Sequence, residues 1–159
     1  MCAASDSSDA SHLKWLEKAL ELARKAASED EVPVGAVIID AQGNVVGEGY
    51  NLREQDQNPV AHAEVLAIQS AAKKLDSWRL SGCTLYVTLE PCPMCLAACQ
   101  QSRLTAVIYG ARDPKGGALS LGYELHQDKR FNHRFPVTQV KSHECGAILS
   151  EFFSRKRKG

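Results

Sequence analysis

The 159-residue sequence predicts an α/β fold in which helices cover both faces of one sheet. Helical and strand patterns alternate along most of the chain, which is typical of strands connected by crossover helices. One segment has apolar residues at helical spacing, at Leu13, Leu16, Leu20 and Ala23. Another segment, residues 83–89, alternates apolar and polar side chains as a strand does. These two patterns and their alternation indicate the α/β class.

The first half of the chain is expected to form a helix, a hairpin and a second helix. Ser11 is the predicted N-cap of the first helix. The β-branched runs at 34–39 and 45–50 flank the turn-forming residues 40–44, which predicts a hairpin. A second helix should span residues 62–75. Its apolar side chains are expected to turn inward, namely Val65, Leu66, Ile68, Ala72 and Leu75.

The second half is expected to complete the sheet and to add two helices. Strands are predicted at 83–89, 106–109 and 137–141. Pro93 fits the first position of a short helix over 93–101, which makes Cys92 its cap. Ser142 should cap a last helix that ends in the basic run Arg155–Lys158. That helix is expected to bury Cys145, Leu149 and Phe152.

Length and composition indicate a cytoplasmic protein with no membrane partner. The chain is long enough for a single domain, expected at 11–159 after a flexible tail at 1–10. Lysine plus arginine balance aspartate plus glutamate at 19 each, so any nucleic-acid binding must come from a local patch. No apolar run would span a bilayer, and the first residues do not resemble an export signal. We therefore expect no disulfides among the six cysteines and interpret the close cysteine pair as metal or redox residues.

Two short motifs predict a metal-dependent hydrolytic site, His62-Ala63-Glu64 and Pro91-Cys92-Pro93-Met94-Cys95. Cys92 and Cys95 lie three residues apart at a helix start, so both sulfurs share one face. With His62 they offer the imidazole and thiolate ligands that zinc prefers. Three protein ligands leave a fourth position for water, whose pKa falls toward ~7 on zinc. Glu64 would move protons beside one Zn²⁺ per subunit without ligating it.

Two other interpretations of the cysteine pair stay open. A purely structural zinc site would need a fourth ligand, for which Cys99 is the candidate on the same helical face. Seven helical residues rise about 10.5 Å, which is too far for Cys92 and Cys99 to reach one ion. We therefore expect Cys99, like Cys83 and Cys145, to be a buried free thiol. A redox pair would leave the His62-Ala63-Glu64 motif without a role.

From about Trp15 to Arg157 the chain resembles the bacterial tRNA-specific adenosine deaminases, and the two motifs match the zinc-deaminase signature. The matching segments are Val32–Val37, Gly47–Asn51, Ala61–Glu64, Trp78–Leu80, Thr84–Cys92, Gly110–Asp113, Asn132–Arg134 and Phe152–Phe153. The resemblance implies a homodimeric zinc hydrolase that converts adenosine to inosine at the wobble position of a tRNA anticodon. It also implies a single CMP/dCMP-type deaminase domain at 11–159. The implied fold is a cytidine deaminase-like three-layer α/β/α sandwich with a mixed sheet of about five strands.

The same resemblance implies the roles of particular residues. His62, Cys92 and Cys95 would be the zinc ligands, and Glu64 would be the proton shuttle. An asparagine in the position of Asn51 hydrogen-bonds the target base in this family. The residues implied to bind the anticodon stem-loop are Asn51, Ala61, Asp113, Lys115, Asn132, Arg134 and Phe152.

Two departures from the family pattern bear on the substrate. The family usually has an aliphatic residue in place of Pro93, and the Pro-Cys-Pro-Met-Cys form resembles free-base deaminases such as guanine deaminase. The stretch Ala118–Gly122 also differs from the usual ordering in the substrate loop. The alternative function is therefore deamination of free guanine, cytosine or cytidine. A catalytically inert, zinc-stabilised RNA-binding module is the remaining alternative.

Overall fold

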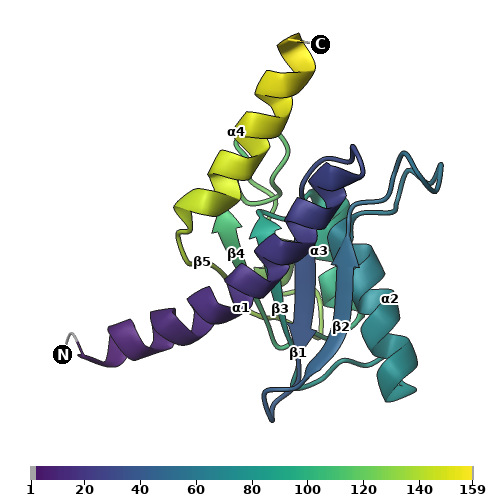
Figure 1. Ribbon diagram of the computed structural model, residues 1–159. Helices are drawn as coiled ribbons and strands as arrows, with labels where there is room; N and C mark the ends of the chain where they lie inside the picture. Colours follow the sequence, from purple (N-terminus) through teal and green to yellow (C-terminus); the bar gives the residue numbers. More distant parts are fainter. Residues whose placement is uncertain (1–2, 159) are drawn as a thin grey trace.

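The computed structural model describes residues 3–158 and contains one sheet between two pairs of helices (Figure 1). In chain order the elements are α1 (Ala3–Ser28), β1 (Gly35–Ile39), β2 (Val45–Tyr50), α2 (Ala63–Leu75), β3 (Thr84–Leu89), α3 (Pro93–Gln101), β4 (Ala106–Ala111), the 3-10 turn η1 (Leu125–Gln127), β5 (Val137–Gln139) and α4 (His143–Lys158). None of the helices in this part of the chain is both long and apolar enough to cross a membrane.

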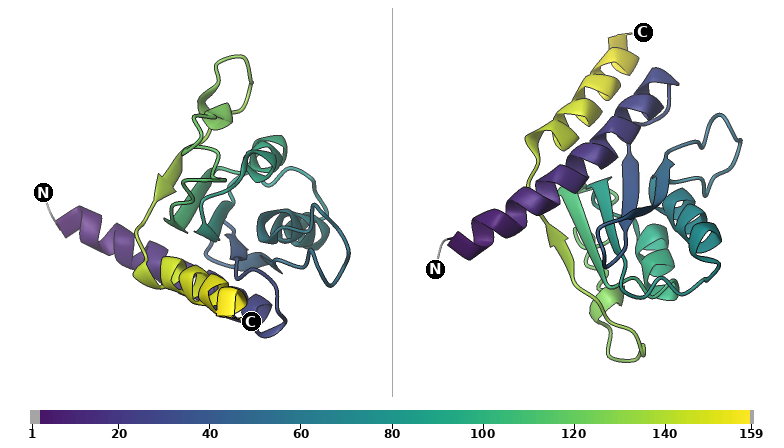
Figure 2. Two further views of the ribbon diagram at one scale, coloured as in Figure 1. Left: turned by 90° about the horizontal axis from the view of Figure 1, so that it is seen from above. Right: turned by 60° about the horizontal axis from the view of Figure 1, so that its bottom comes forward.

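The sheet has five strands in the order β2-β1-β3-β4-β5. β1 is antiparallel to both β2 and β3, whereas β3, β4 and β5 run parallel, so the sheet is mixed. α1 and α4 lie side by side on one face, and α2 and α3 cover the other (Figure 2). The predicted three-layer α/β/α sandwich with a mixed five-stranded sheet is confirmed.

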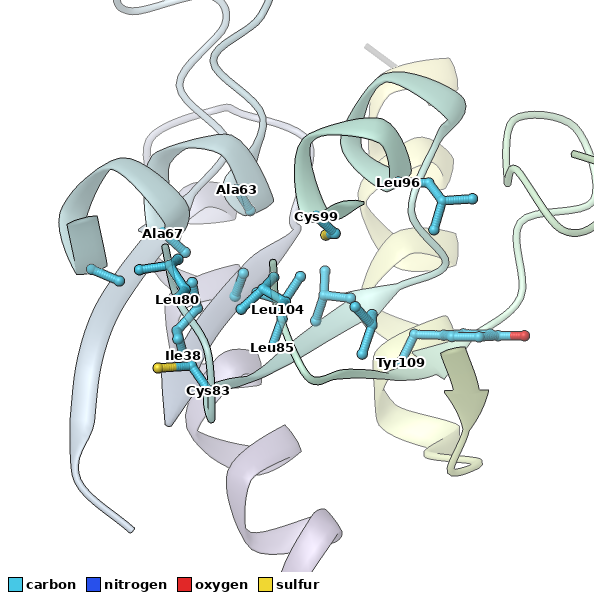
Figure 3. Packing of buried hydrophobic residues seen from close by; sticks show 14 of the residues in the cluster. Ile38, Ala63, Ala67, Leu80, Cys83, Leu85, Leu96, Cys99, Leu104 and Tyr109 are labelled. Carbon is cyan, nitrogen blue, oxygen red and sulfur yellow. The ribbon is translucent and has the colours of Figure 1, made fainter. Parts of the chain in front are cut away.

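Alternate residues of the central strands divide the core into two layers. Val37, Tyr86 and Ile108 are aligned across β1, β3 and β4 and pack toward α1. Their neighbours Ile38 and Leu85 face the opposite way, into the larger core beneath α2 and α3 (Figure 3). This alternation follows from the period of two along a strand, because both faces of the sheet are covered.

α1 begins at Ala3, so the prediction that it starts after an N-cap at Ser11 is wrong. Residues 3–10 contain neither glycine nor proline, and a helix already anchored by its packed half extends at little cost. The predicted tail is therefore helical from Ala3 onward, while residues 1–2 lie outside the described residues. Leu13, the first residue of the helical apolar pattern, is 42% exposed. The assignment of residues 11–159 to one domain stays a prediction.

α2 packs through alanines rather than through its larger side chains. Ala63, Ala67 and Ala71 are fully buried. Of the residues predicted to turn inward, Ile68 and Ala72 pack partly buried against the core, whereas Leu75 is 39% exposed, so the predicted inward face was only partly right. The reason lies in β2, where a Cβ at Gly49 would meet the carbonyl oxygen of Ala63 at 2.4 Å. Glycine on the strand and alanine on the helix let the two backbones approach closely. This contact sets where α2 begins, and therefore where His62 lies.

Candidate metal centre

His62 and Cys92 occupy equivalent positions at the N-terminal ends of two helices. His62 is the N-cap of α2 and Cys92 the N-cap of α3, both with extended backbone, and Pro93 follows at the first helical position. Neither side chain makes a capping hydrogen bond, so both remain available as ligands. Cys95 lies in the first turn of α3. The positive end of the α3 dipole favours anionic sulfur at this place.

The three ligand atoms have the spacing of a tetrahedral zinc site. His62 Nδ1 lies 3.7 Å from Cys92 Sγ and 3.5 Å from Cys95 Sγ. All three atoms lie within 4.8 Å of one another. Zn–S bonds of about 2.3 Å and Zn–N bonds of about 2.0–2.1 Å at tetrahedral angles place nitrogen and sulfur about 3.6 Å apart. The side chains present therefore fit a zinc ion.

No fourth protein ligand joins this group among the side chains that the structure describes, those of residues 9–158. Cys99 is fully buried in the core beneath α3 (Figure 3), and it is a free thiol, as are the buried Cys83 and Cys145. A purely structural zinc site usually has four protein ligands. The arrangement instead has the three ligands of a catalytic site.

The electrostatics of the metal-free side chains suit thiolate ligation and proton transfer. Hydrogen bonds from Cys95 and His62 lower the pKa of Cys92 to about 4, so its sulfur is a thiolate at neutral pH. The same contact with Cys92 raises the pKa of His62. Burial raises the pKa of Glu64 to about 7. A carboxyl group with this pKa can both accept and release a proton near neutral pH.

His62, Glu64 and Cys92 open onto a pocket of about 140 Å³. Its other lining residues come from the segment before β1, from the segment after β2, from the start of α2, from the end of β3 and the residue after it, and from the loop after β4, and they are Val32, Val34, Asn51, Arg53, Ala63, Leu89, Glu90 and Asp113. Ligands bind at such strand ends in many α/β proteins. The pocket therefore joins two of the three metal-ligating side chains, His62 and Cys92, to a site that a small ring can enter.

The residues that the resemblance implied for RNA binding are only partly brought together. Asn51 and Asp113 line the pocket, and Ala61 is buried directly before His62. Lys115, Asn132 and Arg134 are exposed and do not line it. The Arg134 guanidinium instead donates to the carbonyl oxygens of Lys129 and Phe131. The roles of these residues stay predictions.

A larger depression of about 650 Å³ adjoins the pocket. We call it the α4 groove, and its main lining residues are Val32, Asn51, Arg53, Phe152, Phe153 and Lys156. Val32, Asn51 and Arg53 line both hollows, so the two are continuous. Phe152 is buried, and its ring contacts that of Phe153 edge to face. Phe153 lines the groove and is 44% exposed.

Three residues near the pocket were missed from the sequence. Arg53 lies two positions after Asn51 and lines both hollows, and its charge on a turn-rich loop was the available signal. Glu31 and Glu90 are buried carboxyl groups beside this region. Nothing in the residue pattern marked them, because acidic residues next to strand ends are common on protein surfaces.

The chain is similar to deaminases over most of its length. A model of the MafB19-like deaminase family matches residues 10–157. The tRNA-specific adenosine deaminase of Bacillus subtilis is 48% identical over 145 residues, which cover 91% of this chain and 89% of the relative. A solved structure of a tRNA:A34 deaminase that edits A to I at the wobble position superposes with a TM-score of 0.80. It is 39% identical and is matched over 86% of this chain and 99% of its own.

A guanine deaminase structure from Bacillus subtilis is also similar. It has a TM-score of 0.62 and 34% identity over 92% of this chain and 94% of its own. Both the TM-score and the sequence identity are lower than for the A34 deaminase. Pro93 gives the cysteine motif its resemblance to free-base deaminases, but it does not line the pocket. Its place at the first position of α3 explains why a proline fits there.

Proposed function

This chain belongs to the tRNA-specific adenosine deaminase family, and we propose that it hydrolyses the wobble adenosine of a tRNA anticodon to inosine in the pocket beside His62 and Glu64. The observation that carries the proposal is the three-ligand cluster beside a buried carboxyl group, in a pocket continuous with the α4 groove. A base flipped out of a loop could enter such a pocket while its neighbours remain in the groove.

His62, Cys92 and Cys95 would hold a zinc ion, since their spacing and chemistry fit one. Zinc bound there would supply the Lewis acidity that makes a water molecule a nucleophile at neutral pH. Cys92 would bind the ion as a thiolate without having to lose a proton first, because its pKa is lowered to about 4. His62 and Cys92 are fixed by their cap positions on α2 and α3, so the ligands are pre-organised by the helices.

Glu64 would carry the protons of the reaction. It takes one proton from water and passes it to N1 of the base as oxygen bonds to C6. It then takes the second proton from the new C6 hydroxyl and passes it to the exocyclic nitrogen as the C6–N bond breaks. Water is consumed and ammonia leaves, so the carboxyl group ends in its starting state. Its burial suits this role, because the raised pKa of about 7 leaves both protonation states accessible.

Recognition would come from the pocket wall and from the groove. Asn51, which lines the pocket, would hydrogen-bond the base edge. Asp113 lines the same pocket, and Ala61 lies buried directly before His62. Arg53 would contact a phosphate at the junction of pocket and groove. Phe153 offers an exposed ring for a flanking base, backed by Phe152. Lys115, Asn132 and Arg134 would contact the RNA farther out.

We also propose that the protein is a homodimer, as the resemblance implies. Supporting this, α2 and α3 keep apolar side chains only partly covered, among them Val65, Ala97 and Ala98. Val60, just before α2, is 46% exposed. A second copy packed on this layer would bury them. Light scattering after gel filtration should give twice the chain mass, and a monomer at micromolar concentration would contradict the dimer.

The decisive test offers the zinc-loaded protein four substrates in parallel. These are an anticodon stem-loop with adenosine at the wobble position, free guanine, free cytosine and cytidine. We expect inosine in the RNA and no turnover of the small molecules. Turnover of a free base or nucleoside without RNA deamination would overturn the proposal in favour of the free-base alternative. A stem-loop with guanosine at the wobble position serves as the matched control.

A further inference from the structure

We infer that two buried glutamates, Glu31 and Glu90, are positioning residues that hold the two loops lining the pocket in the arrangement that deamination requires. The inference rests on the proposed function. Neither side chain belongs to the metal-ligating group, and neither is needed as the proton carrier. Both are almost completely buried, at 1% and 2% exposed, and each binds the backbone of a loop distant in sequence.

Glu31 anchors the loop that connects β2 to α2. Its two carboxyl oxygens accept backbone N–H groups separately, Oε1 from Glu54 at 3.1 Å and Oε2 from Gln55 at 2.8 Å. This loop carries Asn51 and Arg53 into the pocket and ends at His62. A carboxyl group next to β1 therefore fixes the segment that supplies one wall of the pocket.

Glu90 anchors the opposing loop, residues 112–122, in the same way. Its Oε2 accepts the Ser120 N–H at 2.8 Å. Its Oε1 accepts the Ser120 hydroxyl at 2.7 Å and the Asp113 N–H at 3.2 Å. Glu90 directly follows β3 and stands two residues before Cys92, so the loop is tied to the strand that positions a metal ligand.

Gly117 shows how closely the second loop fits around this carboxyl group. A Cβ at Gly117 would lie 2.0 Å from Glu90 Oε2, so only glycine permits the approach. The Gly117 N–H also closes a turn onto the Asp113 carbonyl at 2.8 Å. The stretch Ala118–Gly122, which departs from the family pattern, thus has a defined role, since its Ser120 binds Glu90 with both backbone and side chain.

A carboxylate suits this task because it accepts several N–H donors and offers none. A glutamine of nearly equal volume would point an NH₂ group at one of those donors, leaving a buried donor unpaired. The loop would then shift, and displacements of about 1 Å at a reacting centre can cost about a hundredfold in rate. Glu31→Gln and Glu90→Gln therefore test the contact while preserving the packing.

The experiment uses the full-length, zinc-loaded protein with Glu48→Gln as the control. Glu48 is exposed on β2 and loses the same charge. Hydrogen exchange is followed in segments 51–60 and 112–122, and kcat and KM are measured on the adenosine stem-loop. We expect Glu31→Gln to accelerate exchange only in the first segment and Glu90→Gln only in the second. Zinc content should stay at one per chain while kcat/KM falls about tenfold to a hundredfold.

Unchanged exchange in the matching loop, or wild-type kcat/KM, would overturn the inference. If a glutamine variant does not fold, Ser120→Ala decides, because it removes the hydroxyl bond to Glu90 and, besides that, only an exposed 3.4 Å contact from Arg112. That variant should loosen segment 112–122 alone and lower kcat/KM severalfold, and wild-type values in both measurements would again overturn the inference.

A wild-type protein that makes no inosine rejects the proposed function instead, while the exchange data still decide the positioning role.

Discussion

His62, Cys92 and Cys95 are attached to the first turns of two helices that rest on the sheet, whereas Arg53 and Phe153 of the α4 groove lie on a loop and near the end of α4. We call the first region the metal corner, defined by His62, Glu64, Cys92 and Cys95. Its geometry depends on close backbone packing, and metal binding there needs all three ligand atoms. The groove is open and presents several partly exposed side chains. Damage to the corner should abolish turnover, while damage to the groove should weaken binding by degrees.

Glu64→Gln should have the largest effect. Glutamine keeps the size of the buried side chain but cannot accept the proton from water, so kcat should fall about 10²- to 10⁴-fold. Zinc should remain at one per chain, because Glu64 is not in the ligand group. Metal analysis and stem-loop deamination measure the two properties. Retention of more than a tenth of wild-type kcat would show that another group moves the proton.

The paired variants Cys92→Ala and Cys99→Ala separate the catalytic site from the structural alternative. Cys92→Ala should lose both zinc and activity, since two ligands hold the ion poorly. Cys99→Ala should keep zinc and most activity and lose only about 1 kcal/mol of unfolding free energy for a small cavity in the core. Treatment of the wild type with a chelator should reproduce the first result. Zinc loss from Cys99→Ala would show a fourth protein ligand.

Gly49→Ala tests how the corner is built. The added methyl group would meet the Ala63 carbonyl oxygen at 2.4 Å, so α2 must move away from β2. We expect a loss of about 1–3 kcal/mol in unfolding free energy together with weaker zinc retention, because His62 moves with the helix. Gly43→Ala is the control, since no atom lies within 4 Å of its Cβ and only its positive φ is strained. Equal zinc affinity in Gly49→Ala and the wild type would contradict this account.

The sequence predicted the corner better than the groove, and the reason is physical. His62, Cys92 and Cys95 were recognisable because zinc demands particular atoms at short spacing, and Pro93 marked the helix start. The alternation of strands and helices predicted a sheet covered on both faces for a similar local reason, whereas the mixed five-stranded form was implied by the family resemblance. The alanine face of α2 was missed because it depends on glycines in another strand.

The groove depends on contacts that no local pattern encodes. Arg53 lies there because Glu31, more than twenty residues earlier, holds its loop. The start of α1 was misjudged because small polar residues can cap a helix or continue one, and the packed half of α1 decides between them. Phe152 was correctly expected to be buried, but its exposed neighbour Phe153 faces the groove.

Arg53→Ala should have the smallest effect and would most sharpen the contrast between the two regions. The corner is untouched, so zinc content and kcat should stay near wild type. Loss of one phosphate contact should raise KM for the stem-loop about tenfold and reduce the slope of log affinity against log salt by about one. Arg24→Ala is the control, because Arg24 pairs with Glu17 and Glu144 on the α1–α4 side of the molecule. A large fall in kcat with unchanged KM would place Arg53 in the corner rather than in the groove.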